Sequence, residues 1–321
     1  MDAKRDADID PAPLIRKRVA IVGYGNQGRP QALNLRDSRI DVRVGLRDGS
    51  PSASRVAADG LRAVPVREAV EEADVVMLLA PDEALAAIYR EIEPALRQGA
   101  ALGFSHGLAI RFGFIAPRSD LDVFMVAPKG PGTALRALYE QGKGMVALYA
   151  VHQDPSGDAE PLALAYGRAI GCGRAGLLPS TFAEECEADL FNEQAVVWGT
   201  VPEILIAGFD TLVAAGISEE VAYMECVGEL TLIAELIEAH GIAGMREAIS
   251  NTAELGAVMG GQRIVDDGVR RRMRQVLDEV RAGRFAEALR DEEASGYPRL
   301  RAARKLSRDL SVEKARRKLL D

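Results

Sequence analysis

Residues 18–28 read "RVAIVGYGNQG", and this stretch decides the fold. A short apolar run at residues 19–22 is followed by Gly23, Gly25 and Gly28 in G-x-G-x-x-G spacing, and a helical pattern, "QALNLRD", begins at residue 31. Such glycines allow a tight turn after a buried strand and let a helix N-terminus meet a pyrophosphate. The spacing alone is weak, but its place between a strand and a helix predicts a dinucleotide-binding site.

The surrounding sequence extends this unit into a domain. Amphipathic helical patterns separate the early apolar runs, which occupy residues 18–25, 41–47, 74–81, 100–106, 122–130 and 145–153. This alternation predicts an α/β Rossmann-type, doubly wound parallel sheet. Long helical patterns then follow, at residues 182–199, 202–215, 218–240, 242–256 and 265–290. We therefore expect a flexible segment at 1–17, a nucleotide-binding domain at 18–182, and an all-α domain at 183–321 with a basic C-terminal tail.

Composition narrows the class of protein. The chain has 321 residues, 48% of them hydrophobic, as in ordinary globular proteins, and a net charge of −8, which argues against a nucleic-acid partner. The cysteines, at positions 172, 186 and 226, have no metal-ligand spacing and predict a reducing, cytoplasmic location. Residues 1–18 lack the apolar region of a signal peptide, and no window approaches a membrane span, so no membrane association is expected. The basic C-terminal tail is interpreted as a solvated helix rather than a nucleic-acid or membrane patch.

The end of the second predicted strand bears on which dinucleotide binds. Dinucleotide sites for NAD usually have Asp or Glu there, whereas this sequence has Arg47, followed by Ser50 and Ser52. A cation with two hydroxyl donors suits a 2′-phosphate, so the sequence favours NADP over NAD. Asp48 argues against a phosphate, and a solvated turn is the alternative.

Two polar residues follow later strands. His106 closes "AALGFSH" and Lys129 follows "DVFMVAP". Ligands bind outside the carboxyl ends of strands in doubly wound sheets, so we expect both side chains near the cofactor. Taken singly, each has a structural alternative, an edge histidine or a loop lysine.

Two helices each carry a pair of carboxylates four residues apart. Asp189 and Glu193 lie in the first helix, and Glu225 and Glu229 in a later one, each pair on the face that also carries apolar residues. Buried anions are costly unless they are paired or bind metal. Oxygen ligands select Mg²⁺ or Mn²⁺, and two ions would balance four carboxylates. The alternative is a pair of solvated acidic helix edges.

In eight ordered motifs, the sequence resembles the short form of ketol-acid reductoisomerase. The resemblance runs from about residue 18 to about residue 290 and rests on "GYGNQG", "LRDGSPS", "HGLAIRFG", "MVAPKGPG", "AVHQDPSG", "EADLFNEQ", "ECVGEL" and "ISNTAE". It implies an NADPH-dependent and Mg²⁺-dependent enzyme of branched-chain amino-acid biosynthesis, with Mn²⁺ as a possible substitute.

The resemblance also implies roles for individual positions. Catalysis falls to His106, Lys129 and Glu229, and the substrate contact to Ser250. Two metal ions would be held by Asp189, Glu193, Glu225 and Glu229. The cofactor set is Gly23, Tyr24, Gly25, Asn26, Gln27, Gly28, Arg47, Ser50, Ser52, Asp82 and Gly132.

The implied reaction is an alkyl migration followed by a reduction. The substrate would be a 2-acetohydroxy acid, such as 2-acetolactate or 2-aceto-2-hydroxybutyrate, and the product a 2,3-dihydroxy acid. In this family the acidic pairs of one site come from different subunits, so a homodimer with shared sites is implied.

Several positions depart from the family pattern. Arg29 and Pro30 replace a usual histidine and small residue, Thr133 replaces a histidine, and Glu247 and Leu255 replace aromatics. Arg29 could add a phosphate contact. These departures leave two alternatives: a specialised paralogue, or a reductase that has lost the rearrangement and acts on a related 2-keto-3-hydroxy acid. A non-catalytic NADPH-binding protein is a third, which the intact acidic pairs disfavour.

Overall fold

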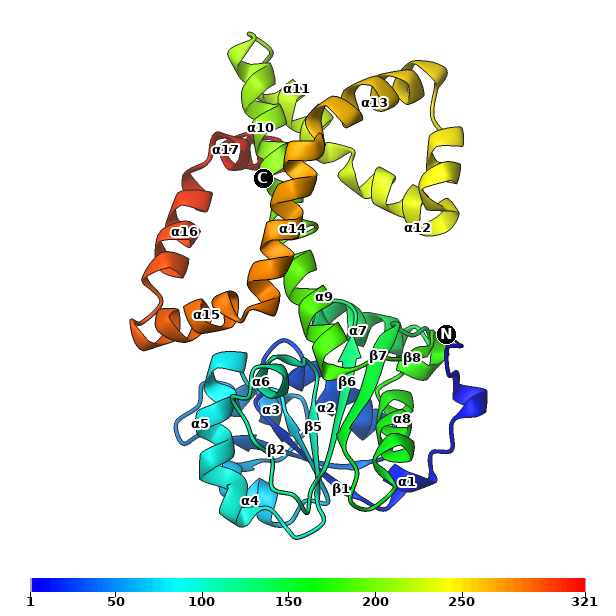
Figure 1. Cartoon of the computed structure of the whole chain (residues 1–321), viewed down its shortest axis with the longest axis vertical. Helices are drawn as coiled ribbons and strands as arrows, with labels where there is room; N and C mark the ends of the chain where they lie inside the picture. Colours follow the sequence, from blue (N-terminus) through cyan, green and yellow to red (C-terminus); the bar gives the residue numbers. More distant parts are fainter. Residues whose placement is uncertain (1, 321) are drawn as a thin grey trace. The chain divides into compact units, whose positions relative to one another are not determined.

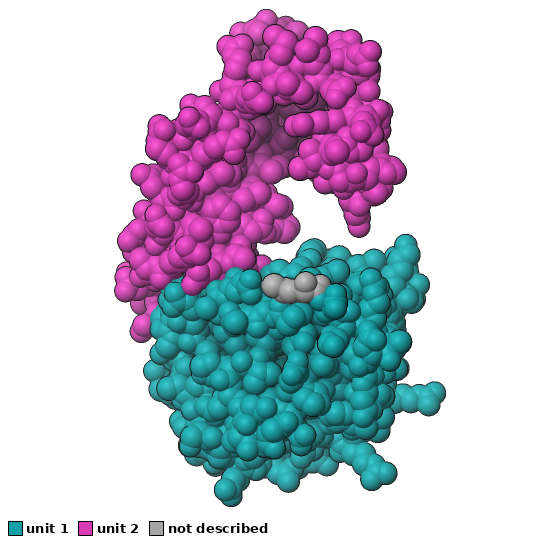
Figure 2. All heavy atoms as spheres, turned by 45° about the vertical axis from the view of Figure 1, so that its right-hand side comes forward, with its two compact units in different colours: residues 1–186 teal, residues 187–321 magenta. Residues whose placement is uncertain are grey.

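A computed structural model describes residues 2–320, and the chain divides into two compact units, Met1–Cys186 and Glu187–Asp321. The division lies inside a helix that begins at Phe182. Figure 2 colours the units separately.

The first unit is built on one eight-stranded sheet, in the order β3-β2-β1-β4-β5-β6-β7-β8. Neighbouring strands are parallel except β6 and β7, which are antiparallel. The strands are β1 Arg18–Val22, β2 Asp41–Leu46, β3 Ala63–Pro65, β4 Val75–Leu78, β5 Ala101–Phe104, β6 Asp122–Pro128, β7 Ala147–Gln153 and β8 Leu177–Pro179. The Rossmann-type sheet is therefore confirmed. The three-residue strands β3 and β8 were not anticipated.

Helices cover both faces of this sheet (Figure 1). The helices of the unit are η1 Asp6–Asp8, α1 Ala12–Ile15, α2 Gly28–Asp37, α3 Ala53–Ala58, α4 Val66–Glu71, α5 Asp82–Ile92, η2 Glu93–Ala95, α6 Leu108–Arg111, α7 Gly132–Glu140, α8 Ala159–Ala169 and η3 Cys172–Arg174. One core lies between the sheet and α2, α7 and α8, and contains Phe124 and Tyr166. The other lies towards α4 and α5, and contains Phe104 and Ile92. Both cores are closed by this unit's own residues.

The N-terminal residues are ordered rather than flexible. Lys4 forms an antiparallel bridge with Leu177, and Leu14 is fully buried. The sequence predicted a flexible segment here, and the structure pairs and packs these residues against the first unit. The physical reason is that β8 would otherwise leave an unpaired edge, and an apolar residue on α1 packs into the core.

The second unit is all-helical, as predicted. Its elements are α9 Phe182–Ala195 (which begins in the first unit), α10 Thr200–Ala214, α11 Glu219–Tyr223, the π-helix η4 Met224–Gly228, α12 Leu230–Glu247, α13 Asn251–Ile264, α14 Asp267–Arg281, α15 Arg284–Ala294, α16 Pro298–Asp309 and α17 Ser311–Leu320. The helix predicted over 265–290 ends early because Gly283 adopts φ +78°.

The core of the second unit is small. Phe209, Tyr223 and Val312 form its centre, between α10, α11 and α17. Among the described residues, α12 and α13 bury no side chain, while Leu232 and Leu255 are 59% and 63% exposed. This unit therefore carries much apolar surface that its own residues do not cover.

One stretch corrects a sequence-based expectation. Phe182–Ala214 is long and apolar enough to cross a membrane by length and composition, with a mean hydropathy of 1.5 and 6% of the window buried. Asp189 and Glu193 lie within it. Length and composition alone do not establish a membrane span, and ionised carboxylates are costly inside a bilayer.

Candidate functional site

The glycine-rich turn after β1 has the geometry of a dinucleotide cradle. Gly23 adopts φ +101°, and a Cβ on Gly28 would lie 2.3 Å from the Gly23 carbonyl oxygen, so both positions require glycine. A Cβ on Gly25 would meet no protein atom within 4 Å. The turn is thus closed by Gly23 and Gly28 and open at Gly25, just before α2 begins, where a phosphate can approach the helix N-terminus.

The turn is fixed to the segment that follows β6. The Gly132 amide donates to Asn26 Oδ1 at 3.1 Å, and Gln27 Nε2 donates to the Gly130 carbonyl at 3.1 Å. A Cβ on Gly132 would lie 1.7 Å from the Asn26 carbonyl oxygen. Three residues expected at the cofactor, Asn26, Gln27 and Gly132, are therefore brought together.

The loop after β2 carries the residues expected at the 2′ position. Arg47 is exposed, and Ser50 and Ser52 are half-buried. The Ser50 amide donates to the Arg47 carbonyl at 3.1 Å, and the Ser52 amide donates to Ser50 Oγ at 3.3 Å. These bonds form a compact turn that leads directly into α3.

Tyr24 and Arg29 both bind a residue outside the predicted set, Asp59. The Tyr24 hydroxyl donates to Asp59 Oδ2 at 2.8 Å, and Arg29 donates to both Asp59 oxygens, at 2.7 and 2.8 Å. The suggested phosphate contact of Arg29 thus gives way, in this structure, to a two-point ion pair.

His106 and Lys129 meet at a buried carboxylate, as the positions of their strands predict. Glu185 Oε2 lies 3.0 Å from His106 Nδ1 and accepts the Gly107 amide at 2.8 Å, while Glu185 Oε1 accepts from Lys129 Nζ at 3.0 Å. The Glu185 side chain is 1% exposed. Two cations and an amide thus compensate one buried anion.

The charges of this cluster support one another. Burial alone would lower the pKa of His106, but hydrogen bonds with Cys186 and Glu185 and the Glu185 charge raise it well above its usual range. Burial alone would raise the pKa of Glu185, but His106, Lys129 and the Gly107 amide lower it overall. Near neutral pH the cluster therefore holds an imidazolium, an ammonium and a carboxylate.

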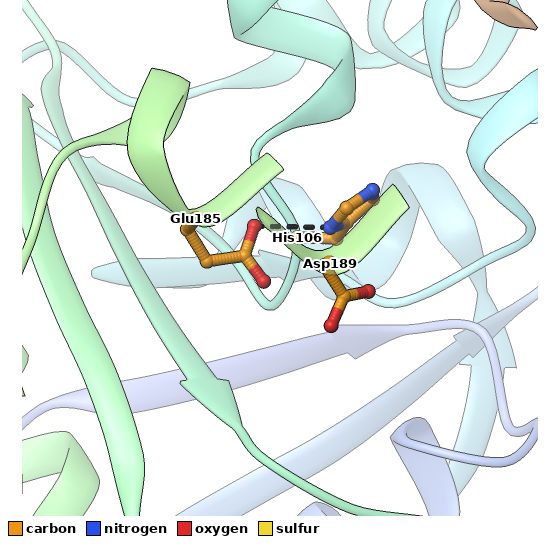
Figure 3. Close-up of side chains that lie close together, drawn as sticks. All are labelled: His106, Glu185 and Asp189. Carbon is orange, nitrogen blue, oxygen red and sulfur yellow. Dashed lines mark hydrogen bonds and ion pairs between the residues drawn. The ribbon is translucent and has the colours of Figure 1, made fainter. Parts of the chain in front are cut away.

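Sequence reasoning missed Glu185. Its spacing was a usable signal, because 185, 189 and 193 follow one another at four-residue intervals along α9 and share a helical face. Figure 3 shows Glu185 and Asp189 on α9, with His106 joined to Glu185 by its hydrogen bond.

A buried polar chain supports the strand end before His106. Gln31 on α2, fully buried, donates to Ser105 Oγ at 2.9 Å and accepts from the Tyr166 hydroxyl at 2.7 Å. It also donates to Gln27 Oε1 at 3.1 Å. The glycine turn and the strand end before His106 are therefore linked through one side chain.

His106, Glu185 and Asp189 lie close enough together to bind a metal ion, but they are not equally suited to do so. Ligand atoms of His106, Glu185 and Asp189 lie within 4.8 Å of one another, the one such group among residues 2–320. Glu185 already accepts hydrogen bonds from Lys129 Nζ and the Gly107 amide. Asp189 is the member of this group suited to bind one, and Glu193 is one turn further along α9.

The second acidic pair lies around the π-helix. Glu225 is inside η4, and Glu229 follows it directly; both are exposed, as is Glu193. The sequence predicted that they share a face with apolar residues that the helix buries, and among the described residues α12 buries no side chain. π-helices are rare and often occur at functional sites. The carboxylate oxygens of Glu225 and Glu229 suit Mg²⁺ or Mn²⁺.

The remaining predicted residues lie at helix starts. Asp82 is the first residue of α5, directly beyond β4, and its charge contributes to the raised pKa of His106. Ser250 is the N-cap of α13, where its hydroxyl accepts the Ala253 amide at 3.2 Å.

Both units match models of one family. Residues 13–176 match the model described as acetohydroxy acid isomeroreductase, NADPH-binding domain, and residues 182–321 match ketol-acid reductoisomerase, C-terminal domain. Among solved structures, an NADH-preferring ketol-acid reductoisomerase from an uncultured archaeon superposes with a TM-score of 0.96 and 42% identity, covering 99% of this chain and 98% of that one.

More distant structures share the fold alone. An oxidoreductase from Jannaschia sp. has a TM-score of 0.63 at 21% identity, covering 85% of this chain and 98% of that one. A pyrroline carboxylate reductase from Plasmodium falciparum has a TM-score of 0.54 at 12% identity, covering 84% and 98%.

Proposed function

Because the chain belongs to the ketol-acid reductoisomerase family, in its short form, we propose that it converts a 2-acetohydroxy acid into a 2,3-dihydroxy acid with NADPH and Mg²⁺. The substrates would be 2-acetolactate and 2-aceto-2-hydroxybutyrate, in cytoplasmic branched-chain amino-acid biosynthesis. The observation that carries the proposal is the cluster of Glu185 with His106 and Lys129, at the strand edge that also carries the glycine turn.

This cluster provides fixed positive charge for the substrate. Glu185 keeps His106 protonated at Nδ1 and holds the Lys129 ammonium, so both donors are oriented before substrate binds. Donors of this kind stabilise negative charge on carbonyl and alkoxide oxygens without reorganising during the reaction. His106 can also return a proton to the reduced oxygen.

Two divalent ions would be held by Asp189 and Glu193 with Glu225 and Glu229. When bound, such ions polarise adjacent hydroxyl and carbonyl oxygens and lower the pKa of the hydroxyl, which favours alkyl migration. The chain's part is to present hard oxygen ligands, and Ser250, at the start of α13, would contact the substrate carboxylate.

A second copy of the chain would complete this site. The proposal rests on the exposed Glu225 and Glu229 and on apolar neighbours such as Leu232 and Ile233, which are 59% and 42% exposed. A homodimer would cover these faces and supply one acidic pair to the other copy's site. Neither nucleic acid nor a membrane is part of the proposal.

The loop at 47–52 bears on the preferred cofactor. Arg47, Ser50 and Ser52 support NADPH, because they offer a cation and hydroxyl donors in one compact loop. The similar archaeal enzyme that prefers NADH supports the alternative. Comparing kcat/KM for the two cofactors at a single pH decides between them.

The activity test measures NADPH oxidation with 2-acetolactate, with and without Mg²⁺, beside a 2-keto-3-hydroxy acid. Metal-dependent turnover of 2-acetolactate is the expected result. Turnover of the keto-hydroxy acid alone would instead establish the reductase-only alternative. No turnover of either compound would overturn the proposal and favour a specialised paralogue.

A further inference from the structure

Asp59 collects side chains from two cofactor-binding elements. It accepts the Tyr24 hydroxyl and a two-point ion pair from Arg29, and its carbonyl oxygen accepts from Arg36. The Tyr24 side chain is almost fully buried, and the Asp59 side chain is 16% exposed. This is a connected, partly buried network rather than a surface ion pair.

The network spans the adenosine side of the site. Tyr24 lies inside the glycine turn, and Arg29 is the second residue of α2. Asp59 directly follows α3, the six-residue helix that begins after the loop at 47–52. Because α3 is one short rigid element, fixing Asp59 also fixes the loop at its other end.

The hydrogen bonds of the network shift the pKa values of Asp59 and Tyr24. The hydrogen bond from Arg29 is the main cause that lowers the pKa of Asp59 to about 2. Burial, together with the Asp59 hydrogen bond, raises the pKa of Tyr24. Asp59 therefore remains an anion and Tyr24 a hydroxyl donor across the working range of an enzyme.

We propose that Asp59 is a positioning residue for the nicotinamide cofactor: by holding Arg29 and Tyr24 it fixes the loop at 47–52 against the glycine turn, and so sets the affinity for the cofactor's adenosine end. This rests on the proposed use of that loop by the cofactor. Asp59 acts through its neighbours and does not touch the reacting atoms. The pair occupies Arg29, one of the positions where this chain departs from its family pattern.

The test separates positioning from charge. Arg29→Gln and Asp59→Asn each change the local net charge, but the double variant removes the ion pair with no net change. We expect the double variant to bind NADPH and NADH about fivefold more weakly, a coupling typical of residues in one network. Its kcat at saturating cofactor should stay within about twofold, since the reacting groups are untouched. Hydrogen exchange of the amides of residues 47–50 and 52, measured without cofactor, should become faster.

Arg118→Gln with Asp120→Asn is the matched control. Arg118 donates to both Asp120 oxygens, at 2.7 and 2.8 Å, so this double variant also removes a two-point ion pair with no net change of charge, and it does so outside the glycine turn and the loop at 47–52. Unchanged binding and exchange in the Arg29–Asp59 double variant would overturn the inference, as would an equal loss in the control. If the parent protein binds neither cofactor, the proposed function fails, while the exchange at 47–52 still decides whether Asp59 positions the loop.

Discussion

The two units treat apolar side chains in opposite ways. In the first unit, every residue of β6 is buried, and two cores close over both faces of the sheet. In the second, a core centred on Phe209 is the largest apolar cluster among the described residues, and long helices leave leucines and isoleucines exposed. The first unit holds the cluster of Glu185, His106 and Lys129, and the second leaves apolar side chains exposed that its own residues do not cover. We therefore expect the stability of the first unit to depend on its own packing, and that of the second on the association proposed above.

Phe124→Ala tests the first half of this comparison and should have the largest effect. Phe124 is fully buried on β6 and lies 6.0 Å from the Tyr166 ring, centroid to centroid. Removing it should cost about 4 kcal/mol of the free energy of unfolding, the usual loss for a buried phenylalanine. Urea unfolding at two protein concentrations should give the same loss at both. A loss that changes with concentration would mean that this core also depends on association.

Leu232→Asp tests the second half. A charge placed in a covered interface should weaken association by about 3 kcal/mol, because it is buried without a partner. Analytical ultracentrifugation should then show a shift from dimer to monomer. Ile15→Asp is the control, since Ile15 on α1 is 56% exposed, close to the 59% of Leu232. Equal behaviour of the two variants would contradict the idea that the second unit is the associating one.

Glu185→Gln asks how far the catalytic groups of the first unit depend on one buried charge. His106 and Lys129 would lose the anion that orients them, so kcat should fall about 100-fold, in the range of lost acid–base and charge positioning. Cofactor affinity should remain near that of the parent, because the glycine turn is unaffected. Steady-state kinetics with both substrates varied provides the measurement, and a parent-like kcat would contradict the role given to Glu185.

Acid unfolding should show the smallest effect. Asp59 has a pKa of about 2 in the folded protein, below its ordinary value of 3.8, so its stabilisation is complete above about pH 4 and is lost as the pH falls through 2. Between these values the parent should lose about 2 kcal/mol more than Asp59→Asn. Asp120, whose pKa beside Arg118 is also about 2, is present in both proteins and cancels from the difference. Parallel stability curves for the two proteins would contradict the assignment.

Local patterns predicted most of the first unit and little of the second unit's surface. Six strands could be predicted from apolar runs, and the turn after β1 from its glycine spacing. Both patterns involve residues that are close together in the sequence. Strand β8 is only three residues long, and it pairs with Lys4 at the other end of the chain, which no local pattern indicates. The same reason hid the Asp59 pairing of Arg29, which joins residues 30 positions apart.

The sequence predicted those residues of the candidate site that directly follow a strand. His106 and Lys129 were expected near the cofactor because each follows a strand end, and they lie close together because β5 and β6 are parallel neighbours. Glu185 was not identified, although its four-residue spacing from Asp189 was visible. The exposure of Glu225 could not be deduced, since a helix with an apolar face reads the same in sequence whether its own chain or another copy covers that face.

The geometry of the second acidic pair depends on the number of residues in the π-helix, because Glu225 lies inside it and Glu229 directly follows it. Each residue of an α-helix turns the chain by about 100°, so deleting Val227 would rotate all of α12 by that amount relative to α11. Glu225 and Glu229 would then be separated by three positions in the chain instead of four. Leu232 would change direction together with the rest of α12. A substitution at this point changes one side chain, whereas the deletion of one residue changes the direction of every side chain on α12. Natural variants with a single-residue deletion between Met224 and Gly228 should therefore be far rarer than variants with a substitution there.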